Sequence, residues 1–141
     1  MGLLEEKRAE KRAREAEKAS KEAENAEYEA IVERLKTAKE MINLNYDNLQ
    51  DLRAEVKEDP DNFESEWKGN KFTEYEAYVK DDIHGTIYYN YQVAVNDILD
   101  DLCNLITEYE NRIYENEGVI GWLKSKINSL SNAIEKILND I

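Results

Sequence analysis

The feature that most constrains this chain is a heptad repeat that runs without a break from residue 95 to residue 141. Apolar residues recur at alternating intervals of three and four, which places them on one narrow helix face and is typical of coiled coils. Gly118 and Gly121 lower the helix propensity near its middle. The repeat stays in phase across them, so we predict one long helix rather than a fold-back. Its two positions are Leu99, Ile106, Ile113, Ile120, Ile127, Ile134 and Ile141, and Val95, Leu102, Tyr109, Asn116, Leu123, Leu130 and Ile137.

A second, shorter repeat covers residues 28–56. Two helical repeats joined by a short segment predict an all-α fold, a long antiparallel two-helix hairpin that is coiled-coil-like. Asn45 would be a buried polar residue of the first helix, and such a residue fixes register at some cost in stability. The repeat is formed by Tyr28, Leu35, Ile42, Leu49 and Val56 at one position, and by Ile31, Ala38, Asn45 and Leu52 at the other.

The turn of the hairpin is predicted at residues 59–72, between helices at 28–58 and 73–141. Pro60 removes a backbone donor and clashes with the preceding helical turn, so we expect the first helix to end before it. The turn also contains Trp67, Gly69 and Phe72. Aromatic residues here either close the apolar space between the helices or form part of a recognition surface.

Residues 1–27 form a charged helical arm of Glu, Lys, Arg and Ala, with a thin stripe of alanines. We expect a solvated spacer or a partner-docking arm. If the chain folds back at its turn, Tyr28 lies opposite roughly residue 102, because both helices rise equally per residue. The apolar residues beyond would then face only alanine and charge. The alanine stripe could cover them, but a large exposed apolar patch usually marks an interface. We therefore predict a helical partner, or a second copy of the chain, at Ile106, Ile113, Ile120, Leu123, Ile127, Leu130 and Ile134.

Composition excludes several classes of function. The net charge of −13 argues against nucleic acid and anionic membranes as partners. One histidine provides neither a paired metal site nor a convincing catalytic base, so we expect no enzyme, metal or cofactor. The single cysteine suggests a reducing compartment. With no signal-peptide pattern and no apolar stretch that spans a bilayer, we expect a cytoplasmic protein, or one exported without a signal peptide.

The motif Trp67-Lys68-Gly69, followed by Phe72 and placed in the turn of an acidic helical hairpin, resembles the WXG-type proteins of type VII secretion. From Tyr28 onward the chain is most similar to the YwqH-like family, whose members accompany LXG toxins. This resemblance implies a helical adaptor or chaperone that binds the toxin's N-terminal helical domain, with or without a second small helical protein, in Gram-positive bacteria. The charged arm lies outside the expected match.

An export signal of the wider family is a tyrosine followed four residues later by an acidic residue. Tyr78 and Asp82 have this spacing, but they lie early in the second helix rather than after it. Two other hypotheses stay open. The chain could be a self-associating structural coiled coil with no secretion role, or a prefoldin-like holdase that grips clients with its arm tips.

Overall fold

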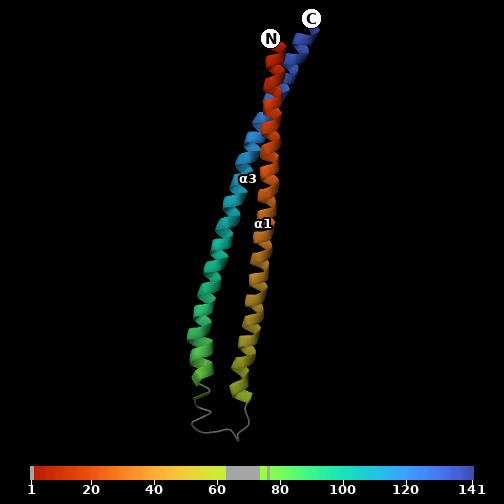
Figure 1. Cartoon of the computed structure of the whole chain (residues 1–141). Coiled ribbons are helices and arrows are strands. Elements are labelled where there is room, and N and C mark those ends of the chain that lie inside the picture. The colour runs from red at the N-terminus through yellow and green to blue at the C-terminus, as the bar shows by residue number, and fades with distance from the viewer. Residues whose placement is uncertain (1, 63–73, 76) are drawn as a thin grey trace. The chain divides into compact units, whose positions relative to one another are not determined.

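The computed structural model describes residues 2–62, 74–75 and 77–141. These residues form two long α-helices, α1 (Leu3–Asn62) and α3 (Tyr88–Asn139), and a π-helix, η1 (Tyr78–Ile87). The two long helices pack antiparallel, which confirms the predicted all-α hairpin (Figure 1). The motif residues Trp67, Gly69 and Phe72 lie outside the described residues.

The chain divides into two compact units, each made from a segment of both long helices. Unit 1 comprises Met1–Arg34 and Ile106–Ile141, so the N-terminal part of α1 lies beside the C-terminal part of α3. Unit 2 comprises Leu35–Leu105. The charged arm is therefore an integral half of unit 1 and continues into the same helix as the apolar repeat.

The end of α1 differs from the prediction. The helix passes through Pro60 and ends at Asn62, beyond the expected end at residue 58. Pro60 stands in the last turn, where its missing N–H removes one helical hydrogen bond and few helical residues follow it.

The second half of the hairpin begins with an element that we did not predict. η1 spans Tyr78–Ile87 and includes Gly85, which lowers the local preference for a regular α-helix. π-Helical turns are rare and frequently occur at functional sites. α3 then continues from Tyr88 to Asn139 through Gly118 and Gly121, which confirms one long helix there.

The core is a single seam along each helix. On α3 the buried residues are Tyr88, Val95, Ile106, Asn116, Leu123 and Leu130, and residues in the predicted heptad positions between them are half-buried. This confirms the α3 repeat as far as Ile137, whereas Ile141, its predicted last residue, is exposed and follows the end of α3. On α1, Tyr28, Leu35, Ile42 and Leu49 are half-buried as predicted, but Asn45 and Leu52 are exposed. Ile31 and Ala38 are half-buried as predicted. The seam also includes the residue after each predicted one, namely Val32, Lys39, Tyr46 and Arg53.

Candidate partner-binding surface

The apolar seam of α3 in unit 1 is covered by the chain itself. Leu123 is completely buried, and Ile106 and Leu130 are at least 90% buried. Because α1 is the element that lies beside α3 in unit 1, its first half supplies this cover. The expectation that these residues would lack cover is therefore wrong for Ile106, Leu123 and Leu130. Ile113, Ile120, Ile127 and Ile134 remain half-buried, and their contact with a partner stays a prediction.

The cover consists of cationic side chains rather than alanines. Toward the N-terminus of α1, residues at intervals of three or four share a face with the buried Asn25 and Val32, and these residues are half-buried. The alanines of the arm are exposed. Lys and Arg can lay their methylene stems on apolar surface while the charged ends reach water. The residues of this face, hereafter the cationic seam, are Lys7, Lys11, Arg14, Lys18 and Lys21.

Acidic residues on α1 form ion pairs with the charged groups of three of these cations. Lys11 lies 4.0 Å from Glu15, Arg14 lies 3.3 Å from Glu17, and Lys18 lies 3.5 Å from Glu22. The side chains of the three cations are only 31–34% exposed, but their acidic partners are 46–51% exposed. The charged ends are thus directed away from the seam, and its apolar surface meets mainly hydrocarbon.

A pair of buried asparagines fixes the register of unit 1. Asn116 Nδ2 donates to Asn25 Oδ1 at 2.9 Å and to Glu24 Oε1 at 3.0 Å. Asn25 Nδ2 in turn donates to the carbonyl oxygen of Ile113 at 3.3 Å. A buried polar group without partners is costly, so a shift of one helix along the other is disfavoured. Asn25 takes the role that we predicted for Asn45, which is exposed.

An aromatic and charged cluster lies next to this pair. The rings of Tyr28 and Tyr109 have their centroids 5.6 Å apart, and the Arg112 guanidinium lies 5.8 Å and 4.8 Å from the two centroids. The hydrogen bond from Asn116 is the main cause that lowers the pKa of Glu24, with smaller contributions from Tyr28 and the charges of Lys21 and Arg112. Partial burial, followed by the hydrogen bond with Glu24, raises the pKa of Tyr28.

Trp122 is a surface residue that the sequence analysis missed. It is 50% exposed, and the Arg14 guanidinium lies 5.1 Å and the Lys126 ammonium group 6.0 Å from its ring centroid. A cation over the face of an indole ring is attracted by the negative potential of that face. Lys126 follows Trp122 by four residues, which puts both on one side of the helix, and this spacing could have identified the pair.

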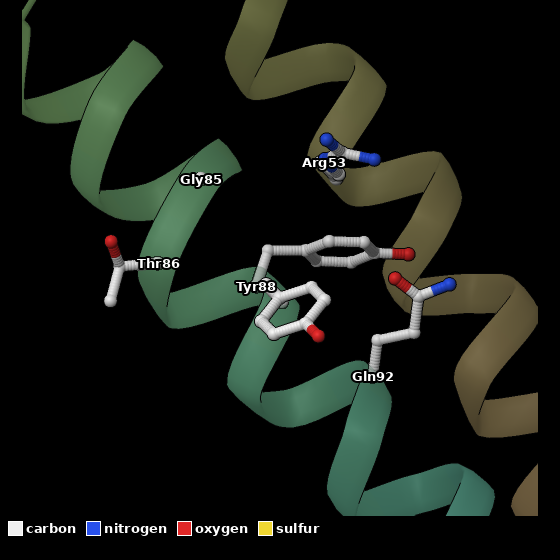
Figure 2. A pocket seen from close by; sticks show the side chains of 6 residues that line it. Arg53, Gly85, Thr86, Tyr88 and Gln92 are labelled. Atoms are coloured by element: carbon white, nitrogen blue, oxygen red, sulfur yellow. The ribbon is translucent and has the colours of Figure 1, made fainter.

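In unit 2 an open hollow lies between α1 and the beginning of α3 (Figure 2). The Arg53 guanidinium stands over the Tyr88 ring, 4.0 Å from its centroid, and Gly85, Thr86, Tyr89 and Gln92 also line the hollow. Loss of solvent around the hydroxyl, followed by the hydrogen bond with Tyr46, raises the pKa of Tyr88. Among its described lining residues, Arg53 is the one cation and there is no carboxylate.

The predicted export signal is only partly visible. Tyr78 begins η1 and is 50% exposed, whereas the side chain of Asp82 lies outside the described part of the chain. Among the described residues no group of His, Cys, Asp and Glu could hold a metal ion. No described helix is both long enough and apolar enough to cross a membrane.

The YwqH-like family model matches residues 9–132. The chain belongs to the YwqH-like family. The match begins well inside the charged arm, so the expectation that the arm lies outside the family is wrong, in agreement with its packing in unit 1. No curated protein and no solved structure matches the chain.

Proposed function

We propose that this YwqH-like hairpin is an adaptor or chaperone that binds the N-terminal helical domain of an LXG-type toxin for type VII secretion. The observation that carries the proposal is the family match over residues 9–132, which covers most of both helices. Its action belongs in the cytoplasm, before or during delivery of the toxin. The motif Trp67-Lys68-Gly69 and the Tyr78–Asp82 spacing are the two places where the secretion machinery could recognise it.

The physical support is a surface suited to helices and unsuited to catalysis. Two long helices offer extended faces, and helix-in-groove contacts use apolar anchors repeated at three- and four-residue spacing. Ile113, Ile120, Ile127 and Ile134 are such anchors on α3, each with part of its side chain exposed. A toxin helix would contact this half-buried edge beside the cationic seam.

The experiment is the absolute mass in solution by light scattering. The purified chain is measured alone and then mixed with the N-terminal domain of an LXG toxin. We expect a defined heteromer in the mixture. A stable homo-oligomer that ignores the toxin domain would overturn the proposal and favour the self-associating structural coiled coil.

The two tryptophans provide a matched pair of variants. Trp67→Ala should weaken toxin binding or export, because the motif is the feature that links the chain to WXG-type proteins. Trp122→Ala, which changes a half-exposed tryptophan in unit 1, should leave both nearly unchanged. Normal toxin binding and export with Trp67→Ala would count against a role for the motif.

A further inference from the structure

One flank of unit 2 carries large exposed apolar residues, most of them on α3. This flank consists of residues that directly precede alternate seam residues, such as Leu52 before Arg53 and Tyr91 before Gln92. In antiparallel helices these positions fall on the same side of the pair. Contacts agree with this register, because Tyr91 stacks on Tyr46 of α1 with ring centroids 6.5 Å apart. In unit 1 the corresponding residue Arg112 reaches the Tyr28 ring of α1.

The large apolar side chains of this flank are 40–59% exposed. On α3 they recur as a stripe along the flank, and such a grouping is more typical of an interaction site than single exposed residues are, whereas on α1 the flank also contains Ala38 and the exposed Asn45. The other flank of unit 2 carries Lys36, Asn43 and Gln50 on α1, and Tyr89, Asn96 and Cys103 on α3. The apolar flank is formed by Leu52, Tyr91, Ile98 and Leu105, with Met41 and Ile87 on its outer edge.

The dimensions of the stripe fit one helix. From Ile87 to Leu105 it rises about 27 Å along α3, at about 1.5 Å per residue. A partner helix of about five turns would cover it. An apolar helix face laid into such a groove is a recurring mode of peptide recognition.

The charges around the stripe favour a partner with basic residues. Its outer edges carry Asp51 and Glu55 on α1 and Asp97 and Asp101 on α3, all exposed. A second copy of this flank would bring carboxylates against carboxylates, and like charges across an interface are unfavourable. Lysine or arginine beside the apolar stripe of a partner would instead face these carboxylates. Among the residues of unit 2 whose side chains the structure describes, the basic ones are Lys36, Lys39 and Arg53, and they lie elsewhere.

We infer that this apolar flank of unit 2 binds one amphipathic helix of a different protein, with an apolar stripe bordered by lysine or arginine. It is a surface separate from the half-buried isoleucines of unit 1. The inference rests on the proposed function only in taking the partner to be a helical protein.

The test uses the full chain and two synthetic helical peptides in isothermal titration calorimetry. Both peptides have the same Leu and Ile stripe, but one has lysine and the other glutamate along its borders. We expect the lysine peptide to bind and the glutamate peptide to bind at least tenfold more weakly. Ile98→Gln should weaken binding of the lysine peptide at least tenfold.

Val93→Gln is the matched control. Val93 is 41% exposed on the same helix, close to Ile98 at 49%, but it lies off the flank. This variant should bind the lysine peptide like the unchanged chain. Circular dichroism checks that both variants keep their helices.

Four results would overturn the inference. They are no binding of the lysine peptide, equal binding of both peptides, an equal loss in Val93→Gln, and a homodimer of the unchanged chain that Ile98→Gln disrupts. No toxin is present, so these failures leave the proposed function standing. A chain that binds the lysine peptide but ignores the toxin domain would overturn only the proposed function.

Discussion

The two units use the same α3 repeat but cover it with different chemistry. In unit 2 the α1 face that meets α3 is largely apolar and aromatic, with Leu35, Ile42, Tyr46 and Leu49. In unit 1 the equivalent positions toward the N-terminus are the cationic seam, from Lys7 to Lys21. Yet the one completely buried large side chain among the described residues, Leu123, lies in unit 1.

The difference shows that the need of a helix for cover and the residues that provide the cover are specified separately. A strong apolar repeat identifies a helix that must be covered, but it does not identify what covers it. In unit 1 the stems of charged residues cover the repeat, and in unit 2 apolar residues do so while further apolar residues remain on the flank. The flank that we propose as a binding surface therefore lies in unit 2, beside the shorter of the two repeats.

The largest expected effect tests whether the cationic seam of α1 buries the apolar seam of α3 in unit 1. Leu123→Ala should lower the free energy of unfolding by about 2–5 kcal/mol, because it leaves a cavity in a fully buried position. Leu105→Ala, on the 40% exposed flank of unit 2, should cost much less. Urea unfolding followed by circular dichroism measures both. Equal losses would mean that the cationic seam does not bury Leu123.

A medium effect concerns the polar pair that fixes register in unit 1. Asn116→Ala leaves Asn25 and Glu24 without their main donor, and an unpaired buried polar group costs about 1–3 kcal/mol. The exposed Asn104→Ala on the same helix is the control and should change stability little. A negligible loss in Asn116→Ala, in the same urea experiment, would show that the pair does not hold the register.

The pH dependence of this variant sharpens the test. Folding lowers the pKa of Glu24 below its ordinary value of 4.5, chiefly through the Asn116 hydrogen bond. The resulting stabilisation is present above pH 4.5 and is lost as the pH falls through the folded-state pKa. The difference between the unchanged chain and Asn116→Ala should therefore be larger at neutral pH than in acid. A difference that grows in acid would contradict this assignment.

The smallest expected effect tests how well a lysine side chain covers the apolar seam of α3 in unit 1. Lys18→Leu should raise the stability of unit 1 by about 1 kcal/mol, since an apolar side chain replaces a charged one over the α3 seam. Arg12→Leu, at an exposed position on the same helix, should not. Thermal unfolding compares the two. Equal melting temperatures for both variants would contradict the placement of Lys18 in the cationic seam.

Several features could be read from the residues because they depend on local pattern. The α3 seam from Val95 to Leu130, its continuity through Gly118, and the antiparallel hairpin all follow from a repeat that stays in phase. The family resemblance came from the turn motif and proved correct, although the motif itself lies outside the described residues. Trp122 and the π-helix were missed, because neither interrupts the apolar pattern.

Only the tertiary structure decided which face of the charged arm is used. By itself, the sequence of residues 1–27 offers an alanine stripe and a lysine and arginine stripe, and helix propensity does not distinguish them. The choice comes from the helical phase of α1, which is one continuous helix from Leu3 to Asn62. Once Tyr28, Leu35, Ile42 and Leu49 face α3, the same phase carried back along the helix brings the lysines inward and leaves the alanines outside. Asn25 and Asn116 then lock that phase, because a shift would leave both amides buried without partners.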